Sequence, residues 1–349
     1  MSMVSLEDVF SSMMEGIVVV DHNRRITTLN KPAALLFGRT TEEVAGHGFL
    51  NKSLIDFLRT SDLDTLAHHV LQKEEPVEEV ITLYQPNPVH VQVHGTVLHG
   101  TGNTVTGALL VLNDVTRLKR LENMRRDFVA NVSHELRTPI TSILGFLETL
   151  LEAPPDDVEV QNRFLTIARD QANRLNLIIE DLLSLSRLES WEGDLPMEEC
   201  SILDLATRTI EICQAQADAR KISIRDVYVG PTKAVVNEHL MEQALVNLVN
   251  NAVKYSYPES TVEIRSVHTA DTLHISVKDE GPGIPPLDRD RVFERFYRVD
   301  RARSRALGGT GLGLAIVKHI ALSHGGEVSV ESIEGKGSTF TITIPQRTR

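Results

Sequence analysis

The chain has 349 residues, of which 41% are hydrophobic, and its 36 basic against 48 acidic side chains give a formal charge of −12 at pH 7. This length and composition predict more than one folded domain, and the acidic balance argues against a protein that binds nucleic acid, although a local basic patch could still bind phosphates. The two cysteines, Cys200 and Cys213, lack metal-ligand spacing and indicate a reducing compartment.

The apolar runs of the chain are short. The longest, at residues 16–20 and 108–112, fall far below the roughly 20 residues that a helix needs to span a bilayer, and the N-terminus has no signal-peptide pattern. We therefore expect a cytoplasmic protein, or the cytosolic part of a parent that carries a membrane anchor elsewhere.

Residues 1–116 predict a small α+β domain. A few helical stretches lie between five short β-type runs, at residues 17–20, 25–29, 77–83, 90–97 and 108–113. The region contains no cysteine, so we expect no flavin bound through a thiol adduct. A haem or a metal remains an alternative because of histidines such as His68, His69, His90 and His94.

Residues 117–190 predict an antiparallel helical hairpin. The helical pattern is interrupted at residues 153–157, where Pro154 and Pro155 end one helix and Asp157 can cap the next. Each helix carries an apolar stripe: Leu118, Leu121, Phe128 and Val132 in the first, and Phe164, Ile167, Ala168, Leu175, Ile178, Ile179, Leu182, Leu185 and Leu188 in the second. Because two helices cannot bury both stripes, we expect a symmetric homodimer with a four-helix bundle. The alternative is that the hairpin packs on the flanking domains of its own chain.

Arg125 interrupts the first stripe at a position where an apolar residue is expected. A buried charge there would weaken the packing and keep two arrangements of the bundle close in energy. We therefore expect Arg125 to help carry a signal along this helix.

The sequence SHELRTP at residues 133–139 places a proline inside the first helix, about one turn after His134. His134 lies beside the stripe and faces outward, where most histidines are simply solvated. Its neighbours indicate a nucleophile: Glu135 can accept the proton of one ring nitrogen while the other attacks phosphorus, and Thr138 could hold a water in line with a phosphorylated His134. Pro139 would let the helix adopt two shapes around this histidine.

Residues 196–349 mix helices and strands again. In the helical segment 243–256, Gln243, Asn247 and Asn251 recur every four residues and Lys254 follows, so amides and an ammonium share one face. Amide oxygens beside a lysine suit a hydrated magnesium and phosphate oxygens. The alternative is a polar stripe that faces solvent, although asparagine is a poor helix former.

Two glycine-rich loops follow in this region. Asp279, after the expected strand 273–277, precedes Gly281 and Gly283, and it could accept a hydrogen bond from a purine amine while the backbone approaches the ring closely. The loop GGTGLG at residues 308–313 opens an expected helix, so its backbone amides form an anion site that suits a polyphosphate. The Walker A pattern is absent.

Between these loops, residues 285–307 combine arginines with Phe293, Phe296 and Tyr297. We expect a mobile basic lid over bound phosphates, which the aromatic rings hold when it closes; a disordered charged loop is the alternative. The arginines are Arg289, Arg291, Arg295, Arg298, Arg301, Arg303 and Arg305.

These motifs resemble those of the sensor histidine kinases. SHELRTP resembles the phosphoacceptor motif of that family, and the asparagine helix, DEGPGI, FERFYR and GTGLGL resemble its four ATP-site boxes in the usual order and spacing. The resemblance covers residue 118 to the C-terminus. It implies a dimerisation and histidine phosphotransfer hairpin at residues 117–190 and a Bergerat (GHKL) α/β sandwich that binds ATP at residues 196–349.

The same resemblance implies roles for single residues. His134 would be the phosphoacceptor, Glu135 the acid/base and Thr138 the residue that positions water in a phosphatase reaction. Asn251 would bind Mg²⁺, and Asp279 would contact adenine. The other nucleotide-binding residues would be Asn247, Lys254 and Tyr255, which support the phosphates and metal, Arg298 on the γ-phosphate, and Gly281, Gly283, Ile284, Gly309, Thr310, Gly311, Leu312 and Gly313.

Residues 1–116 resemble a PAS sensor through the strand pair at 16–21 and 25–30, the LFG helix at 35–38 and the sequence NDVT at 113–116. The domain order is similar to that of the phosphate-sensing and cell-wall-sensing kinases, which are usually membrane-anchored. The resemblance implies ATP and Mg²⁺, a homodimer, a response-regulator receiver domain as partner, and a membrane only if the parent chain carries an anchor absent here.

Three functions fit these motifs. The first is a kinase that autophosphorylates His134 and passes the phosphoryl group to an aspartate of a response regulator, with a phosphatase activity toward that regulator. The second is a Bergerat ATPase that uses ATP for conformational work, which would have no use for SHELRTP. The third is a silent scaffold or a dedicated phosphatase, against which the intact ATP boxes argue.

Overall fold

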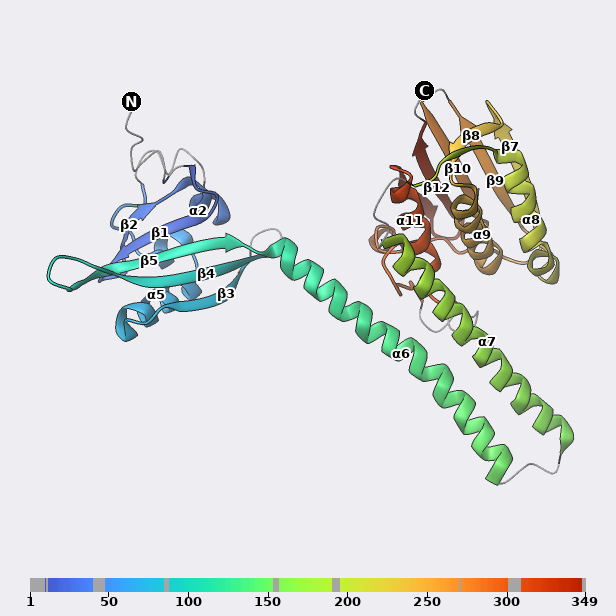
Figure 1. The fold of residues 1–349 in the computed structure, drawn as a ribbon, viewed down its shortest axis with the longest axis horizontal. Helices are drawn as coiled ribbons and strands as arrows, with labels where there is room; N and C mark the ends of the chain where they lie inside the picture. Colours follow the sequence, from blue (N-terminus) through green and yellow to red (C-terminus); the bar gives the residue numbers. More distant parts are fainter. Residues whose placement is uncertain are drawn as a thin grey trace. The chain divides into compact units, whose positions relative to one another are not determined.

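The computed structural model describes residue 10 and residues 12–39, 48–84, 88–152, 157–189, 195–269, 271–300 and 309–346. The chain divides into two compact units, Met1–Asp127 and Phe128–Arg349, and Figure 1 colours the ribbon along the sequence. None of the helices described is long and apolar enough to cross a membrane.

The first unit contains an antiparallel five-stranded sheet. Its strands lie in the order β2-β1-β5-β4-β3, and each predicted β-type run corresponds to one of them. The strands are β1 (Gly16–Asp21), β2 (Ile26–Leu29), β3 (Val77–Tyr84), β4 (Pro88–His99) and β5 (Val105–Asp114), and the helices are α2 (Lys31–Leu36), α4 (Leu54–Leu58) and α5 (Ser61–Lys73). The predicted α+β fold is confirmed.

α5 packs on this sheet because alternate side chains of β5 are buried and join Leu66 and Val70 of α5 in one apolar core. Gly95 of β4 allows the close approach, since a Cβ there would come within 2.7 Å of Val70 Cγ2. Each large side chain fully buried in this way contributes about 1.5–3 kcal/mol. The alternation that predicts the strands therefore also supplies the core.

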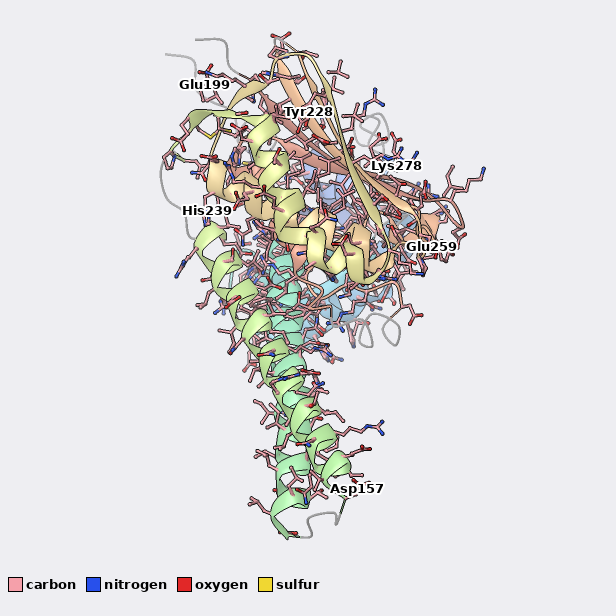
Figure 2. The ribbon with its side chains drawn as sticks, turned by 90° about the vertical axis from the view of Figure 1, so that its right-hand side faces the viewer. Asp157, Glu199, Tyr228, His239, Glu259 and Lys278 are labelled. Carbon is pink, nitrogen blue, oxygen red and sulfur yellow. The ribbon has the colours of Figure 1, made fainter. Side chains whose placement is uncertain are left out.

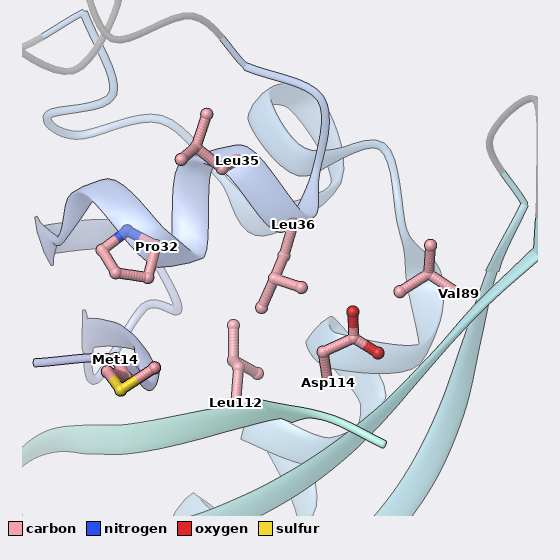
Figure 3. A pocket seen from close by; sticks show the side chains of 7 residues that line it. All are labelled: Met14, Pro32, Leu35, Leu36, Val89, Leu112 and Asp114. Atoms are coloured by element: carbon pink, nitrogen blue, oxygen red, sulfur yellow. The ribbon is translucent and has the colours of Figure 1, made fainter. Parts of the chain in front are cut away.

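A cavity of about 370 Å³ lies beside α2 and the end of β5 (Figure 3). Its lining is apolar except for Asp114. The Asp114 carboxylate also accepts a hydrogen bond from Thr116 N at 2.8 Å, and so it caps the helix that follows. The apolar lining residues are Met14, Pro32, Leu35, Leu36, Val89 and Leu112. Among the residues described, no group of three or more histidine, cysteine or acidic side chains could hold a metal ion.

Two long helices form the predicted hairpin. α6 (Thr116–Glu152) and α7 (Val158–Glu189) are joined by residues 153–157, of which 153–156, with Pro154 and Pro155, lie outside the described residues. The Asp157 carboxylate accepts a hydrogen bond from Glu159 N at 2.8 Å and caps α7 as predicted. Figure 2 shows Asp157 at the end of the hairpin remote from the sheet of the second unit. α6 remains one helix through Pro139, which is buried.

The hairpin leaves a large apolar surface exposed. The buried residues of α7 are Ala168, Ile178, Leu185 and Leu188, and the last two join the core of the second unit. Exposed apolar side chains of the two helices include Ile140, Leu144, Leu147, Leu151, Val158, Leu165, Leu177, Ile179 and Leu183. One end of α7 thus packs on its own chain, and the rest of the hairpin keeps a surface that a second copy could cover.

The remainder of the second unit is the predicted α/β sandwich. Its sheet has the order β11-β12-β10-β9-β7, with β7 and β9 parallel and the other pairs antiparallel, and α8, α9 and α11 cover one face (Figure 1). β6 and β8 form a separate pair. The elements are β6 (Glu198–Ser201), α8 (Ile202–Ala219), β7 (Ser223–Val229), β8 (Lys233–Val236), α9 (Glu238–Tyr255), β9 (Thr261–His268), β10 (Thr272–Lys278), η1 (Pro286–Asp288), α11 (Gly313–Ser323), β11 (Glu327–Ile333) and β12 (Gly337–Pro345).

β10 follows the strand period that this architecture requires. Leu273, Ile275 and Val277 are buried in the core that the helices complete, whereas His274 and Ser276, which alternate with them, are only partly buried. The buried residues of α9 recur at helical spacing, so its other face can carry polar groups.

A buried histidine joins α11 to the start of α9. His324 is 5% exposed; its Nδ1 lies 2.7 Å from the Ile320 carbonyl oxygen and its Nε2 lies 3.0 Å from Asn237 N. Because a carbonyl accepts and a backbone N–H donates, the ring is neutral with its proton on Nδ1. Burial lowers the pKa of His324 and favours this neutral form.

We therefore expect the second unit to lose stability as the pH falls below about 6.5, the ordinary histidine pKa. The unfolded chain then binds a proton at His324 that the folded chain resists, so the contribution is complete above that pKa and decreases on acidification. In His324→Gln the pH dependence should weaken, and the lost buried hydrogen bonds should cost about 1–3 kcal/mol at neutral pH.

Calorimetric unfolding of the full chain across this pH range measures both effects. His239→Gln, at an exposed histidine of α9, serves as the matched control and should keep the wild-type pH dependence. If His324→Gln also keeps it, another group is responsible.

Candidate functional site

The polar face of α9 takes part in two different contacts. Gln243 Nε2 donates a hydrogen bond to Ser184 Oγ of α7 at 2.8 Å, so this residue contacts the hairpin. Asn247 stands at the start of α11, because a Cβ on Gly313 would lie 3.1 Å from Asn247 Oδ1. Asn251 is half-buried, and its side chain makes no hydrogen bond within the described part of the chain, so its amide oxygen remains available to a ligand.

The loop after β10 is held by the buried carboxylate of Asp279. Its Oδ1 accepts hydrogen bonds from Gly281 N at 2.9 Å and Ser338 N at 3.2 Å. Burial raises the pKa of Asp279, and these two bonds oppose the rise. A carboxylate fixed through one oxygen can offer the other to the amine of a purine.

Close backbone contacts explain the glycines of this loop. A Cβ on Gly281 would lie 2.8 Å from the Tyr255 carbonyl oxygen, which brings the loop against the end of α9. Gly283 has a φ of +73°, and a Cβ there would overlap the Ile333 carbonyl oxygen. Ile284 is buried, and its backbone N donates to Ser332 Oγ at 2.8 Å.

The second glycine-rich loop leads into α11. Gly311 has a φ of +77°, and a Cβ there would come within 3.0 Å of Phe296 Cα. The next residue, Leu312, is buried. Within the residues described, no side chain caps the first turn of α11, so its backbone N–H groups remain for an anion. Gly308 lies outside the described residues, and Gly309 is half-buried.

The described part of the predicted lid, up to residue 300, is held by its aromatic side chains. Phe293 packs edge to face on Phe340, with ring centroids 6.1 Å apart. Tyr297 donates a hydrogen bond to Asp288 at 2.5 Å, and the Arg291 guanidinium lies 4.3 Å from the centroid of its ring. Three further lid arginines lie outside the described residues: Arg301, Arg303 and Arg305.

The lid and the glycine-rich loop also contact the hairpin. Phe296 packs on Phe128 of α6, with ring centroids 5.9 Å apart, and Arg295 pairs with Glu189 of α7. Thr310 Oγ1 donates a hydrogen bond to Asp181 Oδ2 of α7 at 2.7 Å. Burial raises the pKa of Asp181, which this bond partly counteracts.

Two arginines share the Glu135 carboxylate of α6. Arg298 Nη2 donates to Glu135 Oε2 at 3.0 Å and to the Thr310 carbonyl oxygen at 2.8 Å, and Arg174 Nη2 of α7 donates to the same Oε2 at 3.3 Å. Burial, followed by the charges of Arg298 and Arg174, lowers the pKa of Lys254 to about 8. The site is therefore rich in positive charge. Lys254 Nζ lies 5.8 Å from the centroid of the neighbouring Tyr255 ring.

The expectation that Glu135 leans toward His134 differs from the observed contacts. Across the described residues no hydrogen bond joins the two side chains, because two guanidiniums attract a carboxylate more strongly than a neutral imidazole does. His134 is exposed, as its place beside the stripe predicts. The Thr138 hydroxyl donates a hydrogen bond to the His134 carbonyl oxygen at 3.1 Å, so it bonds to the backbone here.

The structure thus brings together several residues that the sequence singles out, in three groups. Asn247 meets Gly313, Gly281 meets both Asp279 and Tyr255, and Arg298 meets both Thr310 and Glu135. The sequence analysis missed Arg174 and Asp181. The sequence offers one signal for them: Arg174 and Asp181 are seven residues apart among the apolar residues of α7, so the two charges lie on the same face of the helix.

Three family models match the chain in succession. They are the PAS fold at residues 6–115, the His Kinase A (phospho-acceptor) domain at residues 124–191, and the histidine kinase-, DNA gyrase B- and HSP90-like ATPase at residues 236–348.

Almost the whole chain is similar in sequence to sensor kinases named WalK. The sensor histidine kinase WalK of Bacillus subtilis is 35% identical over 350 residues, which cover 98% of this chain and 55% of that protein. A Staphylococcus aureus sensor protein kinase WalK is 35% identical over 97% of this chain and 80% of its own length. The chain therefore spans about half of the Bacillus relative and most of one Staphylococcus sequence.

Two solved structures have a similar fold. The Acinetobacter baumannii histidine kinase AdeS is 27% identical with a TM-score of 0.51, covering 62% of this chain and 98% of its own. The histidine kinase ThkA, in complex with the response regulator TrrA, is 24% identical with a TM-score of 0.53 and covers 98% of both chains. With three family models in order and a relative matched over most of its length, the chain belongs to the family of sensor histidine kinases.

Proposed function

We propose that this protein uses Mg-ATP to phosphorylate His134 and then transfers the phosphoryl group to an aspartate of a response-regulator receiver domain. One observation carries the proposal, a pair of hydrogen bonds to the hairpin: Arg298 of the lid donates to Glu135, and Thr310 of the second glycine-rich loop donates to Asp181. A loop suited to polyphosphate is thus held against the helix turn that carries His134.

The proposal gives each part of the chain one task. Residues 1–116 would be a PAS sensor, residues 117–190 the dimerisation and phosphotransfer hairpin, and residues 196–349 the catalytic ATP-binding domain. The three family matches support this division.

ATP would lie between α9 and the two glycine-rich loops. Asp279 would accept from the adenine amine, in the loop that Gly281, Gly283 and Ile284 allow to approach the ring. Asn247, Lys254 and Tyr255 would support the phosphates and the metal. The loop at residues 309–313 would bind phosphate oxygens through backbone N–H groups, and Arg298 would contact the γ-phosphate.

The chemistry at His134 is an in-line displacement at phosphorus. A bond forms between one ring nitrogen of His134 and the γ-phosphorus, the bond from that phosphorus to the bridging oxygen breaks, and ADP leaves with the electron pair. Glu135 accepts the proton of the second ring nitrogen and so stabilises the positive charge that develops on the ring. Glu135 must first leave its two arginines to do this.

Asn251 fits the coordination that Mg²⁺ prefers. Mg²⁺ keeps several waters and is bound by one or two protein oxygens together with substrate phosphates. The available amide oxygen of Asn251 suits such a site better than a cage of carboxylates would, and the described residues contain no such cage. When bound, Mg²⁺ would neutralise charge on the phosphate oxygens.

A homodimer would cover the exposed apolar surface of the hairpin, including Leu118 and Leu121. Arg125 is exposed in the single chain, and its proposed part in signalling stays a prediction. A response regulator is proposed as partner because ThkA, which has a similar fold, was solved with one.

The chain would also dephosphorylate the regulator, with Thr138 positioning the attacking water. The Thr138 hydroxyl must turn away from the His134 carbonyl for this task. An ATPase that performs only conformational work is disfavoured because it needs no phosphoacceptor helix, which the second family match covers.

The first test is the chemistry of the phosphorylated protein. After incubation with ATP and Mg²⁺, the chain should carry acid-labile, base-stable phosphate, and His134→Gln should carry none. The variant should still bind ATP, because His134 is an exposed residue of α6 and the two glycine-rich loops belong to other segments of the chain. Phosphate stability and nucleotide titration measure the two results.

His99→Gln, at an exposed histidine of the first unit, is the control and should be phosphorylated normally. Phosphate that persists in His134→Gln, or nucleotide affinity lost with it, would contradict the proposal.

The metal site is tested by Asn251→Ala. Loss of the amide oxygen should raise the Mg²⁺ concentration for half-maximal autophosphorylation about tenfold or more, while binding of ADP in the absence of metal stays unchanged. Asn250→Ala, next to it on α9, should behave as wild type. Equal Mg²⁺ requirements in both variants would move the metal site elsewhere.

The phosphatase role is tested by Thr138→Ala. Autophosphorylation should persist, and hydrolysis of the phosphorylated regulator should largely disappear, because only that reaction needs a positioned water. Thr149→Ala is the matched control and should keep both activities. It removes a comparable exposed hydroxyl of the same helix, which donates a hydrogen bond to the Gly145 carbonyl oxygen at 2.8 Å. Equal loss of both activities in Thr138→Ala would mean that Thr138 is structural.

A further inference from the structure

The side chains of Arg174 and Arg298, called here the arginine pair, have more N–H donors than there are acceptors around them. Both side chains direct Nη2 at one oxygen, Glu135 Oε2, at 3.3 and 3.0 Å. The Nε atoms of both arginines are buried and have no hydrogen-bond partner among the described residues. A buried donor left without an acceptor costs about 1–3 kcal/mol, so the pair is incompletely satisfied.

The charge of the site is unbalanced in the same direction. Two guanidiniums share one carboxylate, and the Arg298 side chain is only 5% exposed while that of Arg174 is 15% exposed. Burial, and after it the charges of Arg298 and Arg174, lowers the pKa of Lys254, so both guanidiniums also act on a third cationic group. A second negative charge would be favourable here.

A phosphoryl group has the chemistry that this site lacks. It offers three oxygens and more negative charge than a carboxylate, and the guanidinium fork matches it through paired N–H donors. The site also touches Glu135, the residue next to His134. Glu135 therefore occupies, with one carboxylate oxygen, a place that a phosphoryl group would fill more completely.

We propose that Arg174, from the hairpin, joins Arg298 in binding the phosphoryl group that moves between ATP and His134, and that Glu135 fills this anion site until the phosphoryl group arrives. The inference rests on the proposed function and adds Arg174 to it. Arrival of the phosphoryl group displaces Glu135, which frees the carboxylate to accept the imidazole proton. Entry of the substrate and release of the base are thereby the same event.

The anion can come from two sources, the γ-phosphate of bound ATP or the phosphoryl group already on His134. Affinities for ADP and for a non-hydrolysable triphosphate (AMPPNP) isolate the first source. The rate at which phosphorylated protein and ADP form ATP reports the second.

In Arg174→Gln, autophosphorylation should fall about tenfold or more, the loss of one charged hydrogen bond. With the γ-phosphate as source, AMPPNP affinity falls by a similar factor while ADP affinity is kept. With the phosphohistidine as source, both affinities are kept and the reverse transfer slows. Arg174→Lys, which keeps the charge but loses the fork, should recover part of the lost function.

Arg169→Gln is the matched control on α7, because its side chain is 69% exposed and pairs only with Asp170 among the described residues. It should leave all these quantities unchanged. Glu135→Gln adds a test in the opposite direction: removal of the competing charge should increase the preference for AMPPNP over ADP if the γ-phosphate is the source, although the acid/base is lost.

The proposal is overturned if Arg174→Gln reacts as fast as Arg169→Gln, or if Arg174→Gln and Arg174→Lys both lose ADP and AMPPNP affinity to the same extent, as a structural role would produce. Should the wild-type chain form no phosphohistidine, the proposed function fails instead, and the comparison of ADP with AMPPNP still tests the anion site.

Discussion

The Glu135 carboxylate is the point at which α6, α7 and the lid meet. Glu135 belongs to α6, Arg174 to α7 and Arg298 to the lid, and their side chains are mostly buried. A buried ion pair contributes little net stability because desolvation offsets the attraction, yet removing one partner costs about 3–5 kcal/mol. These three side chains therefore determine the position of the second glycine-rich loop relative to His134 more than they determine the stability of the unit.

The other contacts between these elements depend on the same placement. Phe296, which precedes Arg298 in the sequence, packs on Phe128 of the hairpin. Thr310, which follows Arg298, donates a hydrogen bond to Asp181 of the hairpin. Both contacts join a helix of the hairpin to a residue that lies outside helices and strands. Arg298 lies two residues after Phe296 and donates a hydrogen bond to the Thr310 carbonyl oxygen, so its movement would disturb both contacts. We therefore expect the second glycine-rich loop and the lid to move together.

Most of the architecture can be predicted from the sequence because its patterns are local. The alternation along β10, the apolar stripes of the hairpin and the capping Asp157 each occupy one short segment. The glycines are predictable for the same reason: Gly283 and Gly311 adopt positive φ within loops that are read as continuous motifs.

The residues that sequence reasoning missed act across long separations. Arg174 meets Glu135 from 39 residues away, and Thr310 meets Asp181 from 129 residues away. An arginine or an aspartate on an amphipathic helix is ordinary, so no local pattern distinguishes these two. The orientation of Glu135 is equally unpredictable, since it results from competition between His134, which is adjacent in sequence, and cations brought in by the fold.

In the first unit, one carboxylate belongs both to a helix cap and to a cavity wall. Asp114 binds the Thr116 amide at the start of α6 and lines the cavity beside α2. A molecule in that cavity that drew on this carboxylate would do so at the expense of the cap. Occupancy of the cavity and order in the first turn of α6 would then be thermodynamically linked, so that each would shift the other by the same free energy.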